Sequence, residues 1–193
     1  MAGPKIIVIG GSLRTGSYST RLAALAVKEL LLADVEVNRV SFEDYEMPIY
    51  DANLENKSGP PAAAVKLKQQ FMAHHGVFIA TPEYNASVPP LLKNGIDWVS
   101  RVRERGDPPY AAFKNRPFAL GSTSPGRFGG ARALIALRQI LELGCGALVL
   151  PDQVSVAHAE TAFNDKDELA EQPAANALRS TLQKLVEMAR LMM

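Results

Sequence analysis

Near its N-terminus the chain reads Lys5-Ile6-Ile7-Val8-Ile9-Gly10-Gly11-Ser12-Leu13-Arg14, continued by Thr15-Gly16-Ser17-Tyr18-Ser19-Thr20. The unbroken apolar run over residues 5–10 is typical of a strand that is buried on both faces of a parallel sheet. A turn rich in glycine and hydroxyl groups follows, and it leads into a helical pattern. A helix N-terminus in that position presents unpaired N–H groups and the positive end of the helix dipole, so we expect an anion there.

The side chains of this first loop favour a terminal phosphate monoester as the anion. Arg14 supplies a forked cation, and the hydroxyl donors are Ser12, Thr15, Ser17, Ser19 and Thr20. The loop lacks the Gly-Lys-Ser/Thr ending of a Walker A loop and the Gly-x-Gly-x-x-Gly pattern of a dinucleotide site. An ordinary turn with a Ser or Thr cap is the alternative, and we favour phosphate binding because the arginine and the hydroxyls occur together.

Strand and helix patterns alternate along the rest of the chain. Strands are predicted at residues 5–10, 35–40, 76–81, 116–121 and 147–150, and helices at 20–33, 62–73, 91–102, 131–143 and 173–191. Residues 43–61 are too irregular for an element of their own, and 163–172 is predicted to be a polar loop. This alternation indicates an α/β fold, an open sheet with helices on both faces. Of two plausible strand orders, 2-1-3-4-5 and a Rossmann-like extension, five strands favour the first.

Composition favours one globular domain over residues 1–193. Hydrophobic residues make up 47% of the chain, and a net charge of +1 gives no electrostatic reason to expect nucleic acid or an anionic membrane as a partner. No segment approaches the roughly 20 apolar residues that span a bilayer. Cys145 is the only cysteine, which favours a reducing compartment, the cytoplasm. The histidines have no ligand partners at metal-site spacing, so no metal is expected.

Two further loops follow the third and fourth predicted strands, whose carboxyl ends lie near that of the first strand in this topology. The second loop, residues 81–90, is stiffened by proline and offers the ring of Tyr84 and the amide of Asn85 to a planar ligand. The third loop, residues 121–130, is rich in glycine and serine, which allows close backbone approach to a flat ligand. We interpret Trp98 as a helix-core residue, whereas Lys93 fits a solvated helix face and an anion contact equally well.

Four motifs occur in order along the chain: Gly11-Ser12-Leu13-Arg14-x-x-Ser17, Pro82-Glu83-Tyr84-Asn85-x-Ser87, Leu92-Lys93-Asn94-x-Ile96-Asp97-Trp98 and Gly129-Gly130. Together they resemble the NAD(P)H-dependent FMN reductase family, and most closely its chromate- and quinone-reductase branch. The resemblance runs from Lys5 to the last helix. It implies a flavodoxin-like three-layer sandwich, FMN as cofactor, NAD(P)H as co-substrate and a homodimer or homotetramer, for which the helices of Trp98 and Leu137 are interface candidates.

The same resemblance implies roles for individual residues. The phosphate of FMN would be held by Ser12, Arg14, Ser17 and Ser19, with Thr20 beside them. The isoalloxazine would be bordered on one side by Pro82, Glu83, Tyr84 and Asn85, and on the other by Ser122 and Gly126. Tyr84 is also the candidate on the substrate side. Thr20 replaces the usual asparagine and Pro90 the usual glycine, and either change could loosen FMN or alter access to the ring.

The resemblance implies an enzyme in which the flavin carries the chemistry and no side chain acts as nucleophile. A ping-pong reduction of quinones, or of chromate, azo or nitro compounds, would follow. The main alternative is a flavodoxin-type electron carrier, which benefits from a strong negative charge that this chain lacks. A phospho-acceptor domain needs acidic residues where Gly10 and Gly11 stand. A Rossmann dehydrogenase using Glu43 needs the missing glycine fingerprint.

Overall fold

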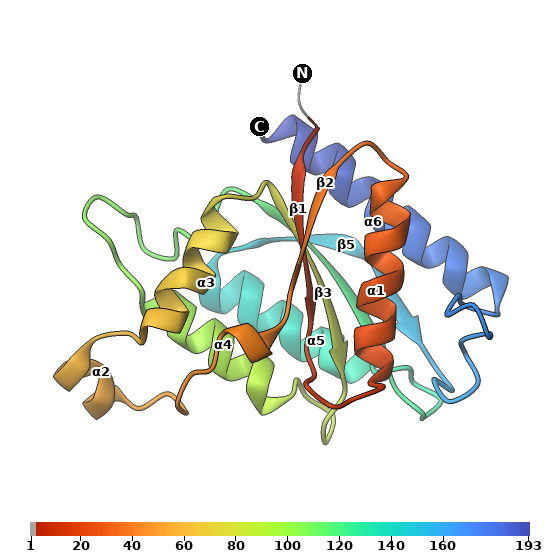
Figure 1. Cartoon of the computed structure of the whole chain (residues 1–193), viewed down its shortest axis with the longest axis horizontal. Helices are drawn as coiled ribbons and strands as arrows, with labels where there is room; N and C mark the ends of the chain where they lie inside the picture. Colours follow the sequence, from red (N-terminus) through yellow and green to blue (C-terminus); the bar gives the residue numbers. More distant parts are fainter. Residues whose placement is uncertain (1–2) are drawn as a thin grey trace.

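A five-stranded, all-parallel sheet in the order β2-β1-β3-β4-β5 forms the centre of the computed structural model, which describes residues 3–193 (Figure 1). The strands are β1 (Lys5–Gly10), β2 (Glu36–Val40), β3 (Gly76–Pro82), β4 (Pro117–Thr123) and β5 (Leu148–Val156). Residues of the central strands β1, β3 and β4 are almost all buried, whereas β2 at one edge is exposed or half-buried except at Val40. The predicted fold class and strand order are therefore confirmed.

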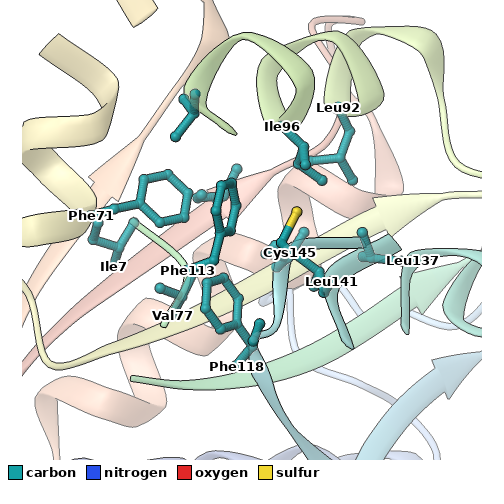
Figure 2. Close-up of a cluster of buried hydrophobic side chains, with 14 of the residues drawn as sticks. Ile7, Phe71, Val77, Leu92, Ile96, Phe113, Phe118, Leu137, Leu141 and Cys145 are labelled. Atoms are coloured by element: carbon teal, nitrogen blue, oxygen red, sulfur yellow. The ribbon is translucent and has the colours of Figure 1, made fainter. Parts of the chain in front are cut away.

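The helices form a layer on each face of the sheet. The helices are α1 (Tyr18–Leu31), α2 (Ala52–Ser58), α3 (Ala62–Met72), α4 (Pro90–Arg101), α5 (Ala131–Gln139) and α6 (Gln172–Leu191). One apolar core joins the sheet to α1 and α6, and a second joins it to α3, α4 and α5. Figure 2 shows the second core, where the rings of Phe71, Phe113 and Phe118 pack together and the Cys145 side chain lies beside Leu141. Burial raises the pKa of the Cys145 thiol to about 11.

The segment 43–61, predicted to contain no helix or strand, contains the helix α2 and overlaps a 3₁₀ turn. A 3₁₀ turn spans Phe42–Asp44, and α2 spans Ala52–Ser58. The Asp51 carboxylate accepts the N–H of Asn53 at 2.7 Å and so caps α2, and Gly59 ends the helix at a φ of 71°. None of the α2 residues is buried, so the helix leaves no apolar periodicity in the sequence.

Three more boundaries differ from the prediction. β5 continues past Pro151 to Val156, with a register shift against β4 between Phe118 and Leu120, and proline is tolerated there because β5 is an edge strand. The fifth helix changes after Gln139 into a π-helical turn, Ile140–Gly144. The expected polar loop 163–172 is tied down, because Phe163 and Leu169 are buried and form a bridge.

Candidate functional site

Three loops meet at the carboxyl ends of β1, β3 and β4 and enclose a cleft. It has a volume of about 120 Å³ and is lined by Ser12, Arg14, Ser17, Tyr18, Ser19, Pro82, Glu83, Tyr84, Thr123, Ser124 and Pro125. The parallel topology forces this convergence, because β1 lies directly beside β3 and β3 beside β4. The cleft therefore brings together seven of the predicted site residues: Ser12, Arg14, Ser17, Ser19, Pro82, Glu83 and Tyr84.

The first loop leaves its donors available. Ser17 is the N-cap of α1, yet its hydroxyl makes no cap bond and lies 2.9 Å from the hydroxyl of Ser19 instead. The first helical N–H groups of α1 have no partner within the helix. Arg14 is exposed, and its guanidinium carbon lies 5.6 Å from the ring centroid of Tyr18. The side chain of Arg14 has no carboxylate partner among residues 3–193. Hydroxyls, free N–H groups and one uncommitted cation suit a phosphate.

Thr20 is placed differently from its neighbours. Its hydroxyl donates to the carbonyl of Ser12 at 3.4 Å, and the residue lines an adjoining cavity together with Arg21, Lys28 and Lys166. Thr20 thus contacts the backbone of the first loop from outside the cleft.

The second loop is a rigid turn. Tyr84 and Ser87 exchange backbone hydrogen bonds of 2.9 and 3.0 Å, and between them Asn85 and Ala86 adopt left-handed φ angles of 49° and 63°. Two consecutive left-handed residues are the geometry of a type I′ turn, and for alanine that geometry is strained. Tyr84 is 47% exposed and lines the cleft, whereas Asn85 sits at the tip of the turn.

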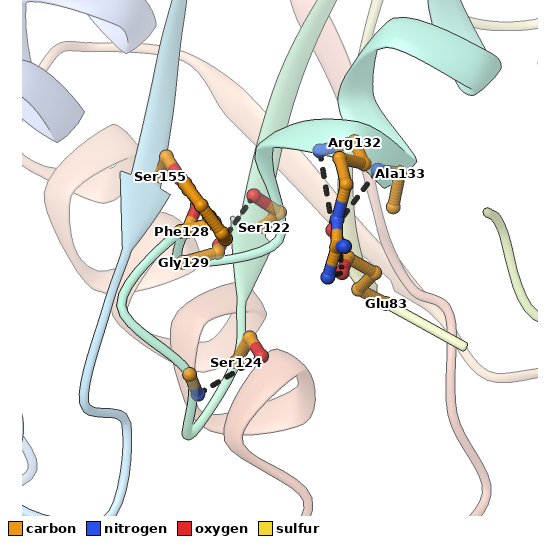
Figure 3. A network of polar contacts seen from close by, with 9 residues as sticks. Glu83, Ser122, Ser124, Phe128, Gly129, Arg132, Ala133 and Ser155 are labelled. Carbon is orange, nitrogen blue, oxygen red and sulfur yellow. Dashed lines mark hydrogen bonds and ion pairs between the residues drawn. The ribbon is translucent and has the colours of Figure 1, made fainter. Parts of the chain in front are cut away.

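The side chain of Glu83 turns away from the cleft. Its carboxylate binds Arg132 and the backbone at the start of α5 (Figure 3). The carboxylate predicted to border the isoalloxazine is therefore engaged by α5, which leaves only the backbone of Glu83 for that role.

At the end of β4, two adjacent hydroxyl side chains differ in their hydrogen bonding. The Ser122 hydroxyl, predicted to border the flavin, is fully buried and donates to the carbonyl of Gly129 at 2.8 Å (Figure 3). Its neighbour Thr123 lines the cleft and is 2% exposed, and its hydroxyl is the one buried side-chain polar atom without a partner among residues 3–193. The Gly126 N–H donates to the Ser124 hydroxyl at 3.2 Å. Sequence reasoning missed Thr123 because serine and threonine fill this loop and only the fold separates their roles.

The residues of the cleft fit FMN. The first loop offers the donor set of a phosphate site at a helix N-terminus, the turn at Tyr84 offers an aromatic face, and Thr123 brings a buried hydroxyl that lacks a partner. Gly129 and Gly130 have left-handed φ angles of 58° and 86°, and a Cβ atom at either would come within 2.9 Å of other atoms. The third loop therefore passes close to the end of β5 at Gly129 and close to Ser122 of β4 at Gly130.

The other candidate residues have structural roles. Trp98 is fully buried, and its indole N–H donates to the carbonyl of Pro48 at 2.7 Å. Lys93 pairs with Asp97 on the same helix at 2.8 Å. His74 Nδ1 lies 2.7 Å from the carbonyl of Gln70, and burial lowers the pKa of His74. His75 accepts the N–H of Lys5 on Nδ1 at 2.9 Å.

Two kinds of feature are absent from residues 3–193, the part of the chain that the structure describes. No group of three or more His, Cys, Asp or Glu side chains is arranged to hold a metal ion there. No helix in that range is long and apolar enough to cross a membrane.

Comparisons with known proteins point to one family. A model of the family described as NADPH-dependent FMN reductase matches residues 4–161. The chain is 34% identical over 188 residues to the NAD(P)H-dependent FMN reductase PA1204 of Pseudomonas aeruginosa, covering 94% of this chain and 92% of that protein. It is 41% identical over 138 residues to a quinone reductase of Escherichia coli, covering 71% and 69%.

Among solved structures, the flavoenzyme NAD(P)H:(acceptor) oxidoreductase FerB of Paracoccus denitrificans superposes with a TM-score of 0.78. The match has 27% identity and covers 97% of this chain and 98% of that one. The flavodoxin-like fold and the predicted family are thereby confirmed. This chain belongs to the NADPH-dependent FMN reductase family, oxidoreductases that use FMN as cofactor and NAD(P)H as reductant.

Proposed function

We propose that this protein reduces quinones with NAD(P)H by a ping-pong mechanism, in which both substrates use one face of the bound flavin in turn. The observation that carries the proposal is the open rim of the cleft. Tyr84 and Phe128, the aromatic side chains of the second and third loops, both stand about half-exposed. An electron carrier that only exchanges electrons would cover the flavin face with such rings, whereas an open face admits nicotinamide.

The side chains of the cleft bind and orient. Arg14 and the hydroxyls of Ser12, Ser17 and Ser19 would hold the phosphate, and Thr123 would donate its free hydroxyl to the same ligand. The turn at Pro82–Asn85 would border the isoalloxazine, with Tyr84 on the side where the second substrate enters. When bound, FMN accepts hydride from NAD(P)H and passes electrons to the acceptor. The protein supplies placement, and no side chain is needed as a nucleophile.

Quinones are the acceptors that the relatives favour. The proteins 41% and 36% identical to this chain are named quinone reductases, and one that is 29% identical is named a 2-hydroxy-1,4-benzoquinone reductase. Chromate, azo and nitro compounds are secondary candidates that an open cleft would also admit.

Steady-state kinetics tests the proposal. NAD(P)H is varied at several fixed concentrations of benzoquinone, and the double-reciprocal lines should run parallel, because each substrate leaves before the other binds. Intersecting lines would indicate a ternary complex. If the FMN-loaded protein oxidises no NAD(P)H with any quinone tested, the electron-carrier function is the better description.

The proposal includes one domain working as a homo-oligomer in the cytoplasm. The only cysteine is a buried free thiol, and an open flavin edge benefits from a second copy that shapes its rim. Trp98 and Leu137, predicted to mark the interface helices, are themselves fully buried within the chain. The outward-facing apolar residue of these helices is Ile135 on α5.

A further inference from the structure

Glu83 is bound on both carboxylate oxygens although it belongs to a surface loop. Its side chain is 5% exposed. Oε2 accepts the backbone N–H groups of Arg132 at 3.1 Å and Ala133 at 3.4 Å, while Oε1 accepts Nε of Arg132 at 2.9 Å and also its Nη2 (Figure 3). A carboxylate held by a helix N-terminus and a guanidinium together is a strong, directional contact.

The contact completes α5. The N-cap of this helix is Gly130, which has no side chain to bind the first N–H groups. Glu83, which lies 49 positions before Arg132 in the chain, binds these N–H groups instead. A negative charge is favourable at a helix N-terminus, so the charge of Glu83 is compensated twice, by the helix and by Arg132.

Arg132 also contacts the third loop. Its guanidinium carbon lies 5.4 Å from the ring centroid of Phe128. The backbone at Phe128 and at the next residue is held by hydrogen bonds, since Ser155 donates to the carbonyl of Phe128 and Ser122 to that of Gly129 (Figure 3). Arg132 and Glu83 therefore join the two loops that flank the cleft.

We propose that Glu83 and Arg132 are a positioning pair for the flavin. The pair holds the turn at residues 82–87 in its binding geometry, and it keeps the negative charge of Glu83 compensated close to the ring. Reduction adds negative charge to the isoalloxazine, so an uncompensated carboxylate nearby would disfavour the reduced form. The inference rests on the placement of FMN in the proposed function, and it adds Arg132, which touches no part of the cleft.

The test measures the flavin midpoint potential and the dissociation constant of FMN from apoprotein in six proteins: wild type, Glu83→Gln, Arg132→Ala, Arg132→Lys, the double variant and Arg179→Ala. Arg179 is a matched control, because it is 53% exposed against 55% for Arg132 and pairs with Glu29 on another face. Arg132→Ala should lower the potential, and Glu83→Gln should raise it. The double variant should return close to wild type, because its local charge is again balanced.

FMN affinity should fall about tenfold in Arg132→Ala, since one charge-assisted contact that orders the loop is lost. Arg132→Lys keeps the charge without the fork, so its potential should stay near wild type while its affinity is intermediate. If both single variants shift the potential in the same direction, or if neither differs from Arg179→Ala, the proposal is overturned. If Arg132→Ala cannot retain FMN although Arg179→Ala does, the positioning role is supported, and the sign of the Glu83→Gln shift decides the electrostatic part.

These readouts need bound FMN but no acceptor. A protein that fails to reduce quinones, yet shows opposite shifts in the two variants, would contradict the proposed function and leave this inference standing.

Discussion

The first prediction concerns the contribution of Arg14 to FMN affinity. Arg14 is the cation of the first loop, and no carboxylate among residues 3–193 pairs with it. A charge-assisted hydrogen bond to a phosphate is worth roughly 1.5–3 kcal/mol. Arg14→Ala should therefore weaken FMN binding by about ten- to a hundredfold in a fluorescence titration of apoprotein. Arg179→Ala, which removes a side chain of α6 that pairs with Glu29 and does not line the cleft, should leave the affinity unchanged. Equal affinities of wild type and Arg14→Ala would move the phosphate site elsewhere.

Tyr84 lines the cleft and yet remains half-exposed, which places it where the second substrate enters. Tyr84→Ala should lower the turnover of quinone several-fold while the FMN content of the purified protein stays nearly the same. The 450 nm absorbance of the pure variant reports the FMN content. Loss of FMN instead would assign Tyr84 to cofactor binding alone.

Single residues show where sequence reasoning reaches its limit. That Arg14, Ser17 and Ser19 line one cleft could be predicted from the first loop, because this loop joins the end of a strand to a helix N-terminus, where an anion is favoured. Ser122 and Thr123 could not be told apart, because adjacent residues of a strand point to opposite faces and only the path of the following loop decides which hydroxyl is consumed. The partner of Glu83 was equally hidden, since nothing local to Glu83 points to Arg132.

At the level of elements, α3 is fastened to the segment after α4 by a buried lysine. Lys68 is 1% exposed, and its Nζ donates to Glu104 at 2.9 Å and also to Asp107. Burial alone would lower the pKa of Lys68, but the bonds to Asp107 and Glu104 raise it above the ordinary value. The bond from Lys68 in turn lowers the pKa of Asp107.

Lys68→Met should lower the free energy of unfolding by about 1–2 kcal/mol near neutral pH, because a charged hydrogen bond is lost from a buried position. The lowered pKa of Asp107 means that its share is present above about pH 4 and is lost as the pH falls further. The raised pKa of Lys68 means that its share is present below about pH 10 and is lost as the pH rises beyond that. Urea titrations of both proteins should thus differ most between pH 5 and 9. If the difference in the free energy of unfolding between the two proteins is constant from pH 3 to 9, the ion pair of Lys68 with Asp107 does not contribute to stability.

Elements with a buried face were predictable and those without one were not. β1, β3, β4 and the long helices each bury an apolar stripe that the sequence displays. α2 has no fully buried residue and is held by its cap and by the ion pair of Glu55 with Arg101, while Pro151 interrupts the apolar pattern of β5. In both cases local turn chemistry or an edge position replaced the periodic signal.

At the scale of the whole molecule, some apolar side chains are exposed on the helix layer formed by α3, α4 and α5. Ile135 protrudes from α5, and Met72 ends α3 partly exposed. A homo-oligomer that covers part of this layer is expected, and light scattering at working concentration should return a multiple of 20.9 kDa. A mass near that of one chain would contradict the expectation, and Ile135→Glu should then change nothing.

The polarity of the sheet places the start of β1 and the end of α6 away from the cleft. β1 begins at Lys5, at the end of the sheet opposite to the three loops, and α6 ends at Leu191 near that same end (Figure 1). A molecule tethered to an electrode or a bead through its last residues would therefore stand with its redox face turned outward. Such an orientation suits mediated electrochemistry, in which a dissolved mediator reaches the exposed face from solution and carries electrons between the protein and the electrode.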